Sequence, residues 1–205
     1  MALYYFDASA VVKYSIPEPG STWVRQLLDV QAPASELAQH LILVAEVTRV
    51  EVAAGLAVLE RVGRIRRAQR VREYQRFTSH LIQRYAIIPL TTNDYVTAAH
   101  LTQHHPLKAY DAVQLAVALR YGIVLTGHPF TFVSGDTTLL TAAHGEGLAT
   151  ENPFNHVTPE EQSGHTESWY VYACRRVYVA FPHGTKLSDM AMSTSIIKGH
   201  TLPGR

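Results

Sequence analysis

Four acidic residues stand in apolar surroundings, where an ordinary surface carboxylate is not expected. Asp7 follows the apolar run ALYYF, and Asp136 ends the stretch FVSGD. Glu51 lies between valines in TRVEVAAGL, and Asp111 lies in AYDAVQLAVAL, the most apolar helical segment of the chain. Because Asp and Glu are almost never fully buried unless they are paired, these four side chains are the candidates for a functional site.

A shared divalent cation is the chemistry that these carboxylates favour if they converge. Their mutual repulsion would raise their pKa values and destabilise the fold, and few basic residues lie beside them, chiefly Lys13, Arg49 and Lys108. A set of oxygen ligands favours hard ions such as Mg²⁺ or Mn²⁺. Such an ion activates water and neutralises charge on a phosphodiester. The hydroxyls of Ser9 and Ser134 could add hydrogen bonds to the carboxylates or to phosphate.

Each acid also has a purely structural interpretation. Asp7 and Asp136 precede predicted helices, and Asp is a preferred N-cap residue. Asp111 could pair with Lys108 on its own helix, and Glu51 could face solvent at a sheet edge. The four acids together favour a site more than any one of them does, and both interpretations stay open from the residues alone.

Apolar runs alternate with helical segments along the first three quarters of the chain. The predicted strands lie in ALYYF, QHLILVAEV (where a helix is the alternative), AIIPL, the region from IVLTG to FTFVSG, and LATENP. Helices are predicted between them, over residues 8–15, 21–30, 48–65, 66–85, 91–105, 107–122 and 136–147. This alternation predicts an α/β fold with a mostly parallel central sheet covered by helices on both faces. Ligands of such sheets gather beyond the carboxyl ends of the strands, where two of the acids lie.

Composition places the protein in a broad class without naming a partner. The net charge of +1 gives no sign of a polyanion-binding protein, so such a partner would need a local basic patch. The single cysteine, Cys174, excludes an intrachain disulfide framework and a cysteine-rich zinc site. With no signal peptide in evidence and no run near the roughly 20 apolar residues of a membrane span, we expect a soluble, cytoplasmic protein without a membrane partner.

The sequence changes character near residue 153. We predict a domain over residues 1–153 and a C-terminal extension over residues 154–205. The extension lacks helical periodicity, and only SWYVYACRRVYVAF alternates like a strand or hairpin. Its Gly-, Ser- and Thr-bearing end predicts partial disorder.

A basic segment follows the helix of Glu51. Its arginines are Arg61, Arg64, Arg66, Arg67, Arg70, Arg72 and Arg76. Arg66 and Arg70 are four apart, as are Arg72 and Arg76, so each pair shares one face of a helix. Contacts from such a face to phosphates give affinity that does not depend on base sequence. The candidates for RNA binding in this segment are Arg64, Arg67 and Arg70, with a solvated helix surface or a docking face for an acidic partner as the alternatives.

Taken in order, the segments YFDASAVVKYSIPEPGS, TRVEVAAGLA, LKAYDAVQLAVAL and FVSGDTTLLTAAHGEGLATENP resemble those of the PIN-domain nucleases. The chain is most similar to the VapC-type toxins of bacterial toxin–antitoxin pairs. The resemblance implies a PIN-like fold and a metal-dependent endoribonuclease whose catalytic acids are Asp7, Glu51, Asp111 and Asp136. It also implies an RNA substrate, a homodimer and a cognate antitoxin.

The same resemblance assigns supporting roles around the acids. Ser9, Thr48 and Ser134 match the small polar residues of the family pattern. It further implies Mg²⁺ or Mn²⁺ held by Asp7 and Asp111, with Glu51 and Asp136 contributing directly or through water. An RNA-processing nuclease without a toxin role and a non-catalytic RNA- or protein-binding module remain as alternatives, and a phosphoaspartate receiver or phosphatase is a weaker one.

Overall fold

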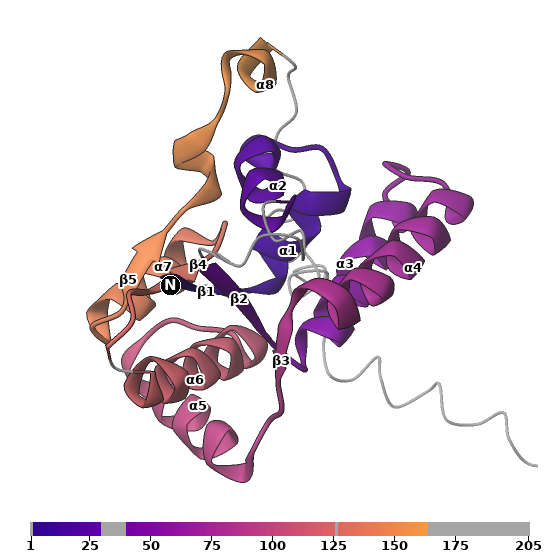
Figure 1. Cartoon of the computed structure of the whole chain (residues 1–205). Helices are drawn as coiled ribbons and strands as arrows, with labels where there is room; N and C mark the ends of the chain where they lie inside the picture. Colours follow the sequence, from indigo (N-terminus) through magenta and orange to yellow (C-terminus); the bar gives the residue numbers. More distant parts are fainter. Residues whose placement is uncertain (1, 30–39, 126, 164–205) are drawn as a thin grey trace, which may run out of the picture.

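The computed structural model describes residues 2–29, 40–125 and 127–163. Figure 1 shows these residues arranged around a central sheet with helices on both of its sides. Within them, five parallel strands lie in the spatial order β3–β2–β1–β4–β5. The strands are β1 (Ala2–Phe6), β2 (His40–Ala45), β3 (Ala86–Ile88), β4 (Phe130–Val133) and β5 (Ala149–Glu151). The predicted α/β fold with a parallel sheet is confirmed.

The winding of the chain reverses between β1 and β4. From β1 the chain moves to β2 and β3 on one side, and it then returns to place β4 on the other side of β1. Asp7 follows β1 directly, and its backbone N–H donates to the carbonyl of Val133 at the end of β4 over 3.1 Å. Ligands of open α/β sheets bind at such reversal points, beyond the carboxyl ends of the strands. Asp7 and residues 134–136 therefore share the position where this architecture places a site.

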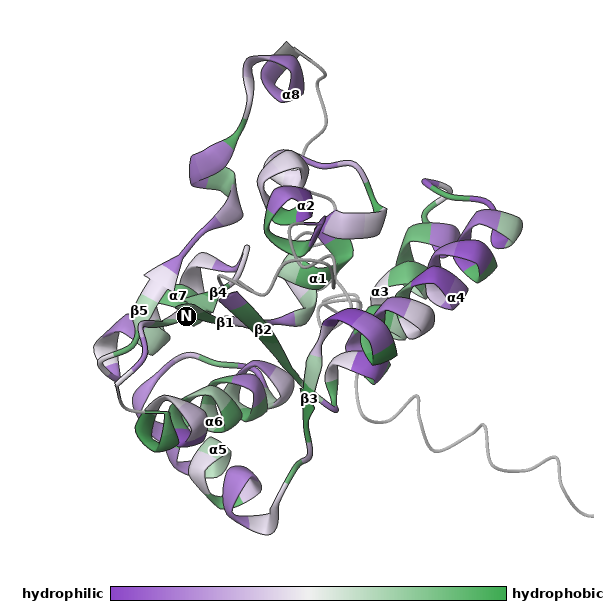
Figure 2. Ribbon diagram, viewed as in Figure 1, coloured by the Kyte–Doolittle hydropathy of each residue, from purple (hydrophilic) through white to green (hydrophobic). Residues whose placement is uncertain are grey.

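Helices cover both faces of the sheet and create two apolar cores. The helices are α1 (Ala8–Ser15), α2 (Ser21–Asp29), α3 (Thr48–Arg61), α4 (Arg67–Arg84), α5 (Thr92–His104), α6 (Ala109–Val124) and α7 (Thr137–Gly145). Because strand side chains alternate between faces, Phe6 packs with α1 to α4, whereas Leu3 and Tyr5 pack with α5 to α7. Figure 2 shows the apolar colour concentrated on the inner strands and on α6.

The prediction that a strand begins at Ile123 is wrong. The predicted helix ended at Gly122, whereas helix α6 continues to Val124. A Cβ at Gly122 would lie 3.1 Å from Leu148 and 3.6 Å from the ring of Phe130. The glycine therefore allows α6 to approach the start of β4 closely, and the strand itself begins only at Phe130.

Residues beyond the predicted boundary at 153 pack on the first two helices. After β5 come a 3₁₀ turn, η1 (Pro153–His156), and a short helix, α8 (Pro159–Ser163). The ring of His156 stacks on Trp23 with centroids 4.4 Å apart, and Lys13 Nζ lies 3.8 Å from the centre of the Phe154 ring. The Glu161 carboxylate accepts from the backbone N–H groups of Gly20 and Thr22. A division of the chain at 153 thus remains a proposal, since the segment immediately after it contacts the body.

Most of the predicted extension, including the expected hairpin around Cys174, lies outside the described residues. Among the helices that the structure describes, none is both long and apolar enough to cross a membrane.

Candidate active site

The Asp7 side chain is held by three hydrogen bonds at the end of β1. As N-cap of α1, its Oδ1 accepts from the backbone N–H of Ala10 (3.0 Å) and from Ser9 Oγ (2.7 Å). Its Oδ2 accepts from Ser134 Oγ at 2.9 Å, and the side chain is buried. The structural interpretation of Asp7 as a helix cap is therefore correct, and it does not exclude the second interpretation, a buried acid at the reversal point of the sheet.

Two serine hydroxyls link the ends of β1 and β4. Ser9 Oγ accepts from the backbone N–H of Gly135 (2.7 Å), and Ser134 Oγ accepts from that of Asp136 (3.0 Å). Asp136 in turn caps α7, since its Oδ1 accepts from the N–H groups of Thr138 (2.7 Å) and Leu139 (3.2 Å). The two aspartates that end neighbouring strands are thus fixed to one another through the serines that the sequence singled out.

Glu51 and Thr48, both in the first turn of α3, are held by a residue that the sequence analysis missed. Gln114 is buried on α6, one turn after Asp111, and its Nε2 donates to Thr48 Oγ1 (3.0 Å) and to Glu51 Oε2. Its Oε1 accepts from the hydroxyl of Tyr5 on β1 at 2.6 Å. The signal was present, because Gln114 is a lone amide in the most apolar helix. The structural alternative, in which Glu51 faces solvent at a sheet edge, does not hold, since its carboxylate accepts from the buried Gln114.

The pKa values of the acids show that their charges act on one another. Burial raises the pKa of Asp7 to about 6, with a further increase from the charge of Asp111. Burial raises the pKa of Glu51 to about 8, assisted by the charges of Asp7 and Asp111. Burial likewise raises the pKa of Asp111 to about 6, and the charge of Asp136 adds to the increase. The charges of Asp7, Glu51 and Asp111 thus act on one another, and the charge of Asp136 acts on Asp111.

The positive charge of Lys108 only partly compensates the negative charge of the acids. It lowers the pKa of Asp111, yet burial and Asp136 raise that pKa by more. Lys13, the other nearby lysine, is fully buried in an ion pair with Glu18 (3.1 Å) and donates to the carbonyl of Pro19. The pairing of Asp111 with Lys108 is therefore too weak to account for the burial of this acid.

The donor set fits a magnesium-type ion more closely than a tightly caged metal. Among the described residues, no group of three or more His, Cys, Asp or Glu side chains has the arrangement to hold an ion directly. Mg²⁺ usually retains several waters and is bound through one or two carboxylates. The four acids provide carboxylate oxygens, which are donors of the kind that such an ion takes.

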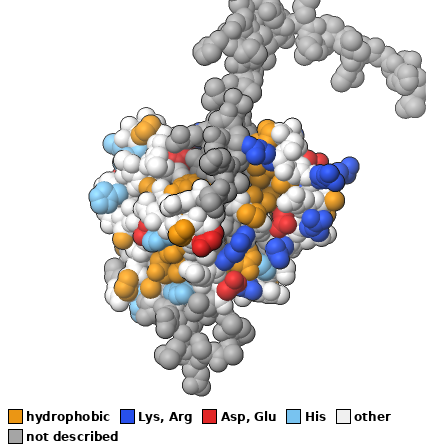
Figure 3. All heavy atoms as spheres, turned by 90° about the horizontal axis from the view of Figure 1, so that it is seen from above, with side chains coloured by type: hydrophobic (Ala, Val, Ile, Leu, Met, Phe, Trp, Pro, Cys, Tyr) orange, Lys and Arg blue, Asp and Glu red, His pale blue; other side chains and the backbone are white. Residues whose placement is uncertain are grey.

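The basic segment lies away from the acids. Arg64 follows α3 and Arg67 begins α4, and both are exposed, whereas Arg70 forms an ion pair with Glu60. Figure 3 shows Lys and Arg side chains on the side of the molecule where α3 and α4 lie. Glu51 is in the first turn of α3 and Arg64 lies beyond its last residue, so the rise of the helix alone separates them by roughly 15 Å. Any RNA contact made by Arg64 would thus lie at a distance from the acids.

Comparison with known proteins supplies the family. The PIN domain model matches residues 4–141, and no curated protein sequence matches the chain. Similar solved structures include VapBC2 from Rickettsia felis, bound to a DNA fragment from its promoter, and PAE2754 from Pyrobaculum aerophilum. The first is 13% identical, with a TM-score of 0.50, over 73% of this chain and 98% of that one. The second is 16% identical, with a TM-score of 0.49, over 85% and 91%. At 13% identity, VapBC2 supports the fold alone. The family model spans residues 4–141, more than half of the chain, and the chain therefore belongs to the PIN domain family.

Proposed function

We propose that the protein is a metal-dependent endoribonuclease and the toxin of a toxin–antitoxin pair. The observation that carries the nuclease proposal is the coupling of the buried Asp7 to three half-buried acids at the reversal point of a PIN-domain sheet. Perturbed carboxylates that converge in this way are typical of functional sites. The toxin role is supported by the similarity in fold to VapBC2 and by the resemblance in sequence motifs.

In this mechanism the protein supplies orientation and charge. A bound Mg²⁺ or Mn²⁺ would supply a Lewis acid and an activated water for attack on phosphorus. Asp7 and Asp111 would hold the ion, with Ser9 and Ser134 fixing the Asp7 oxygens. Glu51, held by Gln114, would carry a proton on its carboxylate, since burial raises its pKa to about 8, close to the neutral range that suits acid–base chemistry.

The proposed partners follow from the same family assignment. A cognate antitoxin would bind the toxin and present a cationic group to the acids, whose buried negative charge favours such a contact. The protein would act on RNA in the cytoplasm as a homodimer.

Cleavage of an RNA oligonucleotide tests the enzyme directly. We expect the purified full chain to cut single-stranded RNA in Mg²⁺ or Mn²⁺, to stop when EDTA is added, and to leave a DNA strand of the same sequence intact. Binding of RNA without any cleavage in either metal would favour the non-catalytic module instead.

Loss of Gln114 is expected to slow this reaction without unfolding the protein. Gln114→Leu keeps the apolar packing of α6 and removes the donor to Glu51, and loss of such a supporting hydrogen bond costs about 10–100-fold in activity or metal affinity. Cleavage rate and Mn²⁺ affinity are measured together with the unfolding curve. Gln75→Leu, a change of the same type at an exposed position on α4, is the control. A Gln114→Leu enzyme with the wild-type rate and Mn²⁺ affinity would show that Gln114 has no positioning role.

The exposed arginines are expected to affect binding more than chemistry. In Arg64→Gln/Arg67→Gln we expect weaker RNA binding at low salt and a salt dependence shallower by about 0.7 per lost phosphate contact. The rate at saturating RNA should stay the same, because these residues lie far from the acids. Arg84→Gln serves as the control, since Arg84 is engaged with Asp29 at 2.9 Å. An unchanged salt slope in the double variant would identify the basic segment as an ordinary solvated surface.

A further inference from the structure

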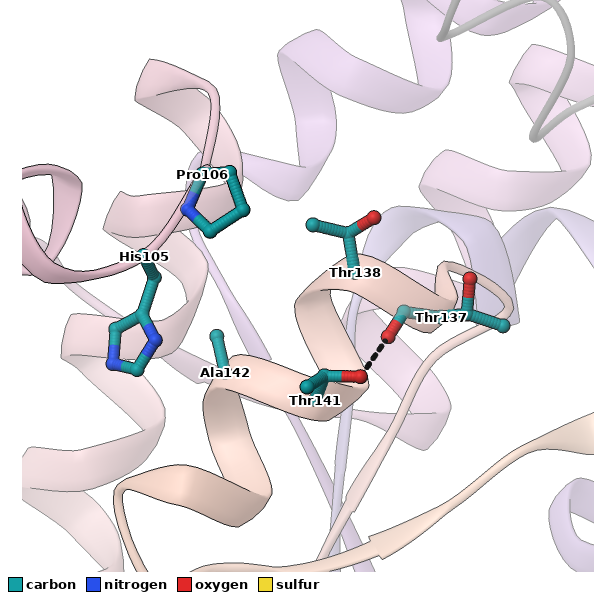
Figure 4. Close-up of a pocket in the computed structure, with 6 residues that line it drawn as sticks. All are labelled: His105, Pro106, Thr137, Thr138, Thr141 and Ala142. Atoms are coloured by element: carbon teal, nitrogen blue, oxygen red, sulfur yellow. Dashed lines mark hydrogen bonds between the residues drawn. The ribbon is translucent and has the colours of Figure 1, made fainter.

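We infer that a hollow beside the acidic cluster holds the base and ribose of the RNA nucleotide next to the scissile phosphate, an inference that rests on the proposed function. The hollow measures about 290 Å³ and lies between the loop before α6 and the outer side of α7 (Figure 4). This volume is at the lower end of small-molecule sites, which span roughly 300–1,000 Å³, so it suits a single nucleoside. Its lining residues are His105, Pro106, Thr137, Thr138, Thr141 and Ala142.

Both walls of the hollow are continuous with the acidic cluster. On one wall, the backbone N–H of Thr138 donates to the carboxylate of Asp136 over 2.7 Å. On the other, the chain runs from Pro106 into α6, whose first turn carries Asp111. The charges of Asp111 and Asp136 act on one another, so the segments that continue the two walls lead to two acids that lie near each other. A chain whose phosphate lies at the acids therefore has its adjoining nucleotide within reach of the hollow.

The charges around the hollow disfavour a phosphate as its occupant. No Lys or Arg is among its lining residues, and the backbone N–H of the lining residue Thr138 donates to the Asp136 carboxylate. His105, the one lining group that can become positive, already contacts the Glu146 carboxylate at 2.7 Å. An anion would be repelled by these carboxylates, whereas a base and a ribose carry no charge. The occupant is thus the neutral part of a nucleotide.

The lining chemistry matches that neutral part. Thr137 and Thr138 bring hydroxyl groups to the lining, and Figure 4 shows the Thr138 side chain beside Pro106, with its methyl group on the Pro106 side. Thr141 Oγ1 donates to the carbonyl of Thr137 (2.8 Å) and so retains its acceptor capacity. Hydroxyls of this kind can donate to or accept from base edges and the ribose 2′-hydroxyl. The rings of Pro106 and His105 add flat surfaces against which a base can lie.

A double substitution removes two hydroxyls while keeping the shape of the hollow. Thr138→Val/Thr141→Val leaves the backbone contact to Asp136 and all four acids in place. Thr78→Val is the matched control, because Thr78 Oγ1 donates to the carbonyl of Gln75 at 2.9 Å on α4, as Thr141 does on α7. Each full-length variant is compared by its unfolding curve before RNA is added.

Sequencing of cleaved ends from a random oligoribonucleotide pool then measures the base preference at each position around the cut. We expect the wild type to show a preference at a position adjoining the cut, and the double variant to reduce it about fivefold, in line with the loss of about one hydrogen bond. Thr78→Val should keep the wild-type profile. Binding of the same pool is measured separately, with each variant placed in an Asp7→Asn background that prevents cleavage.

The outcomes separate this inference from the proposed function. RNA cleavage with an altered adjoining-base preference or weakened binding in the double variant supports the hollow as a nucleotide subsite. RNA cleavage and binding that match the Thr78→Val control at every position overturn the subsite and leave the nuclease standing. Failure of the wild type to bind or cut RNA overturns the proposed function, and with it the subsite.

Discussion

The Asp7→Asn variant is expected to cleave RNA at least about a hundredfold more slowly than the wild type. This loss is at the low end of what one acid–base or electrostatic group contributes. The substitution removes one charge at the centre of the cluster and keeps the shape of the side chain. The Asn Oδ1 can still accept from Ser9 Oγ and the N–H of Ala10, and the hydroxyl of Ser134 can rotate to accept from Nδ2. The cap of α1 survives, so the loss of activity is assigned to chemistry and not to unfolding.

Removal of this charge is also expected to stabilise the metal-free protein. At neutral pH the ionised Asp7 carboxylate destabilises the folded state. Burial and the charge of Asp111 disfavour its negative charge and raise its pKa to about 6. Asp29→Asn provides the same chemical change at a residue outside the cluster, where the acid pairs with Arg84. Equal cleavage rates, or equal inhibition of growth on induced expression, in wild type and Asp7→Asn would remove the proposed mechanism.

Without divalent ions, the free energy of unfolding is expected to fall as pH rises from about 5 to about 8. The pKa values of Asp7 and Asp111 lie near 6 and that of Glu51 near 8, above the usual 3.8 and 4.5, so the folded state binds more protons than the unfolded state. Stability therefore decreases with pH across this window. The change is on the order of a few kcal/mol, since each pKa unit corresponds to about 1.4 kcal/mol. His80, whose pKa burial lowers, contributes in the opposite direction.

Urea unfolding at pH 5.5 and pH 8, in EDTA and in Mg²⁺ or Mn²⁺, measures this dependence. The ion should restore stability at pH 8 and have little effect at pH 5.5, because it binds the ionised carboxylates. Glu51→Gln should flatten the profile most, since Glu51 has the largest shift among the three. A metal-free wild type whose stability stays level or rises between these pH values would contradict the coupling of the acids.

Local sequence patterns predicted the strands and helix starts better than they predicted the partners of each side chain. Asp7 carries the same signal whether it caps a helix or lies in a site, and the structure shows that it caps α1 inside the cluster. Glu51 could not be assigned from α3 alone, because Gln114, which buries its carboxylate, comes from a helix more than sixty residues later.

Long-range contacts also explain the other differences. The packing of His156 on Trp23 and of Glu161 on Thr22 joins segments from opposite ends of the described chain, and neither segment shows strong periodicity. Glycine commonly ends a helix, yet Leu148 approaches Gly122 closely, so this glycine has a packing role inside α6. In each case the deciding residue lies far away in sequence.

The most direct measurement is anomalous X-ray diffraction from crystals of the full chain grown in Mn²⁺. We expect one or two manganese peaks between the carboxylates of Asp7 and Asp111, with water molecules that link the metal to Glu51 and Asp136. A manganese-saturated crystal with no peak between these two aspartates would contradict the claim that the acids share an ion.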